Sequence, residues 1–130
     1  MRVPATGCVL RNTTSNSLPT ELFLDGAGER IKVPMNGRWA FDITILASSP
    51  ANETGAWQIR GLIRNLGGVT MLVGGPPNPI NLGGEGTATW AVTAAADDLN
   101  DALVVRVNGP AVGGGVVRWV ATVRTTELIF

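Results

Sequence analysis

Apolar and polar side chains alternate with a period of two along much of this chain. The alternation is clearest in four stretches that begin at a tryptophan: WAFDITILA at Trp39, WQIRGLIRN at Trp57, WAVTAAA at Trp90 and WVATVRTTEL at Trp119. Successive side chains of a β-strand point to opposite faces, so each stretch predicts a strand with one buried face. The 17 glycines and 8 prolines leave little room for helices, and no stretch shows a convincing helical period.

The strands predicted from this pattern are 7–11, 20–24, 30–33, 38–47, 57–65, 69–73, 88–96, 102–108 and 115–126. Many short strands joined by turns are typical of sandwiches and barrels. We therefore predict an all-β fold, an antiparallel β-sandwich with jelly-roll-like topology, in a single domain over 1–130. The segment 74–87 carries three prolines and five glycines, so we expect it to be irregular, as an exposed loop or a crossover between sheets.

The four tryptophans have two interpretations. Each shares its side of the strand with Ile, Val or Phe, which predicts that the indoles form the wide centre of the core. The alternative is a row of exposed indoles that stacks on sugars. Cys8, the single cysteine, is expected to be a small core residue, with a reactive thiol as the alternative.

The charges balance, with ten basic and ten acidic residues. A general nucleic-acid or membrane-surface binder would carry a basic excess, so neither partner is expected. The chain also has no apolar run of roughly 18 residues, the length that would predict a membrane span. Its first residues, MRVPATGCVLRNTTSNS, contain no apolar signal-peptide core, so we expect synthesis in the cytosol and no secretion.

The residues that usually carry out catalysis are scarce. The chain has no histidine and no tyrosine, which removes the usual general base and the commonest metal ligand. Carboxylate pairs for glycoside hydrolysis, Asp42 with Glu53 or Glu85 with Asp97, are possible in principle, but nothing singles out either pair. We predict that the protein is not an enzyme and uses no cofactor and no metal.

One acidic cluster has the ligand types of a calcium site. Asp97, Asp98, Asn100 and Asp101 offer oxygen ligands at close spacing, as Ca²⁺ prefers. The spacing does not match an EF-hand loop, and acidic and amide residues are also what a hairpin turn favours. The interpretation we prefer is a turn.

The basic residues are nearly all arginine, with nine arginines and the single lysine Lys32. Five of them fall on strand positions opposite the core side chains: Arg60, Arg64, Arg106, Arg118 and Arg124. If their strands are neighbours, the five arginines share one sheet face, and we expect this face to meet another subunit or a particle surface, because arginine is favoured at interfaces. The alternative is a solvated face with cross-strand pairs to Asp42 or Glu127.

The last residues, Leu128, Ile129 and Phe130, are apolar. An apolar terminus left in water is uncommon, so we expect these residues to be buried against a partner in a homo-oligomer.

Six motifs follow one another along the chain: VLRNTT, ELFLDGAGERIKVPMNGRWAFDITILA, GAWQIRGLIRN, TMLVG, TWAVTAAADDLNDALVVRVNG and VRWVATVRTTEL. Their order resembles that in a domain of tailed-bacteriophage structural proteins, which is often found at the C-terminal end of tail fibres. The resemblance covers residues 8–128. The chain differs from the family pattern at two places. It opens with Met1 where such domains usually follow a longer N-terminal region, and its segment 74–87 is richer in proline than expected.

This resemblance implies a location in the virion and no enzymatic activity. The protein would be a capsid decoration (cement) protein, or a tail-fibre or spike element involved in host attachment. Its partners would be copies of itself, as a trimer first and a dimer second, and other virion proteins. The alternative function is a carbohydrate-binding module that recognises a host-surface glycan.

Overall fold

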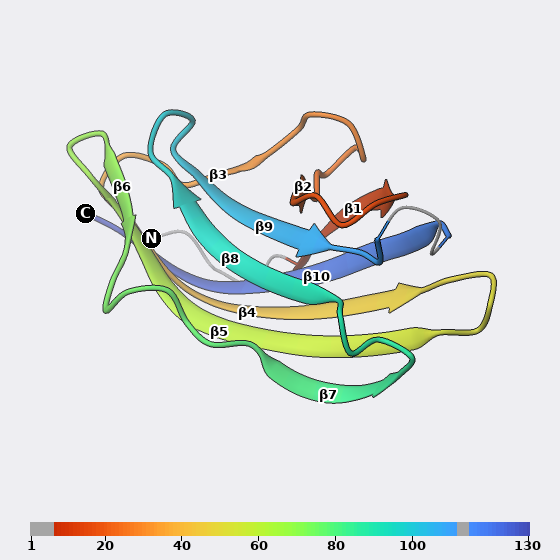
Figure 1. The fold of residues 1–130 in the computed structure, drawn as a ribbon. Helices are drawn as coiled ribbons and strands as arrows, with labels where there is room; N and C mark the ends of the chain where they lie inside the picture. Colours follow the sequence, from red (N-terminus) through yellow and green to blue (C-terminus); the bar gives the residue numbers. More distant parts are fainter. Residues whose placement is uncertain (1–6, 112–114) are drawn as a thin grey trace.

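The computed structural model describes residues 7–111 and 115–130, which form ten β-strands and no helix. The strands lie in two curled antiparallel sheets, and the prediction of an all-β sandwich is confirmed (Figure 1). Within these residues, no helix has the length and apolar character needed to cross a membrane.

The larger sheet has six strands. Its order is β1 (Gly7–Thr14), β10 (Val117–Ile129), β4 (Gly37–Ser48), β5 (Thr54–Leu66) and β6 (Val69–Leu72), and β7 (Ile80–Glu85) also pairs with β5. In the four-stranded sheet, β9 (Ala102–Asn108) pairs with β2 (Thr20–Glu21), β3 (Ile31–Lys32) and β8 (Ala91–Asp97).

The chain passes repeatedly from one sheet to the other. It crosses between β1 and β2, between β3 and β4, between β7 and β8, and between β9 and β10. As a result, β10 lies between β1 and β4, and β9 lies beside β2 and β3, so that strands from the two halves of the chain are neighbours in both sheets. The β4–β5 and β8–β9 hairpins each stay within one sheet.

The prediction for the segment 74–87 is wrong in part, because this segment contains the strand β7. Residues Ile80–Glu85 pair with the first half of β5, with a register shift between Ala56 and Trp57. Gly83 has φ 154°, a conformation that L side chains rarely adopt, so the glycine is what lets the strand follow its partner here.

The tryptophans confirm the prediction of a core role. All four indoles are buried, with 2% to 6% of each residue exposed. Trp119 is at the centre: its ring centroid lies 5.7 Å from that of Trp57 and 5.6 Å from that of Trp90. Its indole N–H donates a 2.9 Å hydrogen bond to Thr14 Oγ1. Trp90 lies just before β8, not in a strand as predicted, because its N–H closes a turn onto Thr87 O.

A glycine makes room for another core ring. Gly61 on β5 is the cross-strand partner of Phe41 on β4, and both face the core. A Cβ atom at Gly61 would lie 2.6 Å from Phe41 Cζ. The Phe41 ring therefore lies directly against the β5 backbone, an approach that a larger residue at position 61 would block.

Two smaller predictions agree with the structure. Cys8 is partly buried and packs against the core. The cluster around Asp97 forms the β8–β9 turn: the Asn100 backbone N–H and side-chain amide donate to Asp97 at 3.2 and 2.7 Å, and Asp101 has φ 51°. The acidic and amide residues here shape a hairpin, as predicted.

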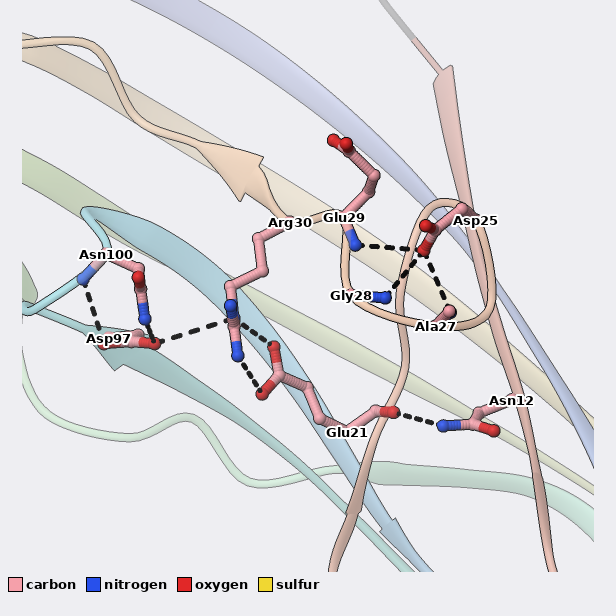
Figure 2. A network of polar contacts seen from close by, with 9 residues as sticks. All are labelled: Asn12, Glu21, Asp25, Ala27, Gly28, Glu29, Arg30, Asp97 and Asn100. Atoms are coloured by element: carbon pink, nitrogen blue, oxygen red, sulfur yellow. Dashed lines mark hydrogen bonds and ion pairs between the residues drawn. The ribbon is translucent and has the colours of Figure 1, made fainter.

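Arg30 joins the two strands that flank β9 (Figure 2). Its Nε lies 2.8 Å from Glu21 Oε2 on β2 and 3.8 Å from Asp97 Oδ2 on β8. Between these contacts, Val104 is only 1% exposed although it points away from the sandwich core. The bridge therefore ties β2 to β8, the two strands on either side of β9.

The loop before Arg30 is held by one carboxylate. Asp25 Oδ1 accepts hydrogen bonds from the backbone N–H groups of Ala27, Gly28 and Glu29 at 2.8 to 2.9 Å (Figure 2). These bonds, that from Glu29 above all, lower the pKa of Asp25 from 3.8 to about 2. They favour the charged form of the group.

Because the folded-state pKa is depressed, Asp25 stabilises the fold above pH 3.8, and this contribution is lost as the pH falls toward about 2. We expect Asp25→Ala to lower the urea midpoint of unfolding above pH 3.8 and to differ little from wild type below about pH 2. Glu29→Gln, in the same loop, is the control, because it keeps the backbone N–H that donates to Asp25. A gap between Asp25→Ala and wild type that stays constant with pH would contradict this role of the carboxylate.

Candidate protein-interaction surface

The candidate surface is the outer face of the six-stranded sheet, which turns away from the core. It is made by alternate residues of the strands, and the register sets them in rows. One row places Asp42 on β4 directly between Arg124 on β10 and Arg60 on β5. We call this surface the outer face.

Four of the five predicted arginines lie on the outer face: Arg60 and Arg64 on β5, and Arg118 and Arg124 on β10. These two strands are not neighbours, since β4 runs between them. The expectation that Arg106 shares the face is wrong. Arg106 is on β9 in the other sheet, with Glu21 and Thr93 as its cross-strand partners.

Two further arginines belong to the outer face and were missing from the predicted set. Arg11 is opposite Val120, and Arg38 is opposite Arg64. Arg38 donates to Asn36 O at 2.9 Å, and Arg64 Nη2 lies 3.5 Å from Met71 Sδ. The alternation around WAFDITILA could have identified Arg38, because this residue directly precedes the stretch and falls on the same side as Asp42.

The central row contains the face's one ion pair among the described residues. Arg60 Nε lies 3.4 Å from Asp42 Oδ2, with side chains 66% and 42% exposed. Gln58 donates to the same carboxylate at 3.0 Å. An ion pair this exposed contributes little, roughly 0–1 kcal/mol. Glu127, the other expected partner, instead accepts a hydrogen bond from Thr125 Oγ1 at 2.6 Å.

Exposed apolar side chains are interspersed among the arginines. They are Val9, Leu46, Leu62, Met71, Val120 and Leu128, each between 39% and 52% exposed. Single apolar side chains on a surface are ordinary, but a set of them on one sheet face is typical of a surface that binds another protein.

The last three residues lie at the edge of this face. Leu128 is the cross-strand partner of Arg38, and Ile129 is the partner of Gly37. Phe130 is 83% exposed, and its ring centroid lies 4.6 Å from the Arg38 guanidinium carbon. That a partner buries these side chains remains a prediction.

A groove of about 490 Å³ opens at the end of the outer face where β4 ends and β10 begins. Its lining includes Leu46, Val120, Arg11 and Arg118. The backbone of Phe23 pairs with that of Arg11 at 2.8 and 3.1 Å, which brings Asp25 and its loop to one wall. Two guanidinium groups beside apolar side chains suit an acidic partner that also buries an apolar group.

The carboxylate pairs considered for catalysis are spread over different elements. Glu85 is on β7 in the six-stranded sheet and Asp97 on β8 in the other. Asp42 is in mid-strand, whereas Glu53 is in the β4–β5 turn and accepts a hydrogen bond from Ser49 Oγ at 3.1 Å. In the part of the chain that the structure describes, no three His, Cys, Asp or Glu side chains form a group that could hold a metal ion.

We compared the chain with protein-family models and with curated proteins. No family model matches it, and no curated protein matches it.

Proposed function

We propose that the protein is a non-enzymatic structural component of a tailed-bacteriophage particle, either a capsid decoration protein or a tail-fibre or spike element. It binds copies of itself or other virion proteins through the outer face. The resemblance in motif order supports the assignment to a phage particle. The outer face supports the proposal that the protein acts by binding other proteins.

The observation that carries the proposal is the mixture of side chains on the outer face. Arginines and half-exposed leucine and valine side chains alternate across four adjacent strands. A face that only has to stay in water could use lysine equally well, whereas arginine makes bidentate contacts and tolerates partial desolvation. Arginine is also enriched at protein interfaces.

The alternative, glycan recognition, loses its stacking platform. All four indoles are in the core, and among the described aromatic side chains only Phe130 is largely exposed. Sugar binding would therefore depend on polar groups, without the flat aromatic surface that the alternative required. Protein–protein contact is the function that the surface supports better.

The proposal is tested on particles of the phage that encodes the chain. Immunogold labelling with an antibody to the protein is expected to mark capsid or tail. Arg60→Ser combined with Arg118→Ser is expected to weaken binding to undecorated particles. The same double substitution should leave the melting temperature nearly unchanged, since the one ion pair it removes is exposed.

Arg106→Ser is the matched control, because it removes an arginine from the other sheet and should leave particle binding unchanged. Unlabelled particles would overturn the virion proposal. Labelled particles together with unaltered binding of the double variant would instead show that contact is made by loops or chain ends.

A further inference from the structure

The β8–β9 turn presents an apolar side chain in an acidic setting. Leu99, at its tip, is 92% exposed. It follows Asp97 and Asp98 directly and stands two residues before Asp101. An isolated exposed leucine is ordinary, but here it is surrounded by three carboxylates in five residues, which gives the tip a defined chemistry.

The turn is also fixed in place. Asp98 Oδ1 accepts a 2.7 Å hydrogen bond from the Thr70 N–H, and Asp101 Oδ1 accepts a 2.9 Å bond from Thr70 Oγ1. Asn100 closes the turn onto Asp97. Thr70 on β6 and Asp97 on β8 thus fix the turn by hydrogen bonds. Because the turn backbone is already ordered, little conformational entropy is lost when a partner binds Leu99.

The groove on the outer face is mainly basic, because Arg11 and Arg118 line it and the one carboxylate of its lining, Asp25, accepts hydrogen bonds from backbone N–H groups of its own loop. Leu46 and Val120 are 51% and 39% exposed there, and Arg11 and Arg118 lie beside them. In the described residues, Arg118 makes no ion pair and no side-chain hydrogen bond. The groove's volume of about 490 Å³ is within the range of about 300–1,000 Å³ that binding pockets span.

Among the described residues, the outer face and the β8–β9 turn differ in charge. Six arginines lie on the outer face against the acids Asp42 and Glu85. The β8–β9 turn instead carries Asp97, Asp98 and Asp101, and among the described residues only Asp97 of these three makes an ion pair, with Arg30. The remaining cations of the four-stranded sheet, Lys32 and Arg106, lie on β3 and β9. A chain with no net charge thus presents an arginine-rich face and an acidic turn, and such surfaces attract each other between copies.

The turn and the groove lie at opposite ends of the sandwich (Figure 1). The β8–β9 turn is at the end near β6, and the groove is where β10 begins and β4 ends. The turn therefore lies out of reach of the groove of its own copy, whereas it is accessible to a second one.

We propose that the β8–β9 turn of one copy docks into the groove of the next, with Leu99 against Leu46 and Val120 and the Asp98 carboxylate beside Arg118. This inference rests on the proposed function in its self-associating form. The contact joins two different patches, so it is heterologous and closes into a ring or grows into a filament. A three-membered ring would give the trimer expected from the resemblance to fibres.

The test begins with two variants that each remove one half of the contact. Leu99→Ser removes the apolar tip, and Val120→Asp places a carboxylate in the groove. Both positions are exposed, so near-native melting temperatures are expected and are checked first. Each variant should raise the apparent dissociation constant for self-association, measured by light scattering over a concentration series, by about tenfold or more. Leu18→Ser, an exposed leucine elsewhere, should change nothing.

Mixing the two variants is the decisive step. One retains its groove and the other its turn, so a heterologous contact predicts that the mixture forms 1:1 dimers and stops there. Asp98→Asn keeps the acceptor for Thr70 and removes the charge, so it should weaken association and reduce its dependence on salt.

Three results would overturn the inference: a native protein that stays monomeric at every concentration, variants that associate like wild type, or a mixture without dimers. The proposed function is judged separately by the labelling of particles. A labelled particle with unaltered self-association of Leu99→Ser would refute the docking and leave the virion assignment standing.

Discussion

Replacing Trp119 with alanine is expected to lower the free energy of unfolding by about 3–5 kcal/mol. The indole is 2% exposed, stacks on Trp57, contacts Trp90 and donates a hydrogen bond to Thr14. Its removal leaves a cavity between the two sheets and an unpartnered hydroxyl, and neither can be filled without moving several strands. Urea denaturation followed by circular dichroism gives the change directly.

Two comparisons separate packing from the hydrogen bond. Trp119→Phe retains a ring but not the N–H, so its cost should be clearly smaller, whereas Trp57→Ala should approach that of Trp119→Ala. Leu18→Ala, in an exposed loop, should stay within about 0.5 kcal/mol of wild type. In the native protein we expect blue-shifted tryptophan emission and weak quenching by iodide, and strong quenching of two or more indoles would refute the buried cluster.

Enlarging Gly61 to alanine is expected to destabilise the fold by about 1–3 kcal/mol, although alanine generally suits a strand better than glycine. The added Cβ would lie 2.6 Å from Phe41 Cζ and 3.2 Å from Pro77 Cγ, so the ring or the backbone has to shift. Thermal and urea unfolding measure the loss.

A second substitution tests whether the Phe41 ring is the cause. In a Phe41→Leu background the terminal ring atoms are absent, so Gly61→Ala should cost at least about 0.5 kcal/mol less than in the native protein. Gly28→Ala is the matched control, because no atom lies within 4 Å of its added Cβ. Equal costs in both backgrounds would show that backbone strain, not the ring, sets the penalty.

The alternation of side chains was enough to predict the sandwich and its core. Trp39, Trp57 and Trp119 each share a strand face with β-branched or aromatic neighbours, and burial of that face forces the register. Strand β9 was predicted with its observed bounds, 102–108, because its run of apolar residues ends at a turn on both sides. Burial of one face is a local property, so a local pattern is able to reveal it.

What the pattern missed depends on partners distant in the chain. β7 reads as a loop because glycine and proline dominate GGPPNPINLGGEG, and it is a strand because β5 extends far enough to offer hydrogen bonds at its edge. Likewise, Arg106 and Arg118 both alternate with core side chains along their strands, yet these strands belong to different sheets. The alternation of side chains predicts which face of a strand an arginine lies on, whereas the order of the strands in the sheets decides which arginines are neighbours.

The glycines of β7 have a consequence for solubility. All six of its residues are exposed, and among the described strands it pairs with β5 alone, so one edge of its backbone is open. An open, regular edge is a template on which other chains add strands and aggregate. Gly83 and Gly84 make the second half of this edge irregular and poor in side chains that would stabilise an added strand, whereas the first half exposes Ile80 and Leu82. The same glycines that concealed the strand in the sequence thus shorten the regular part of the edge on which another chain could add a strand.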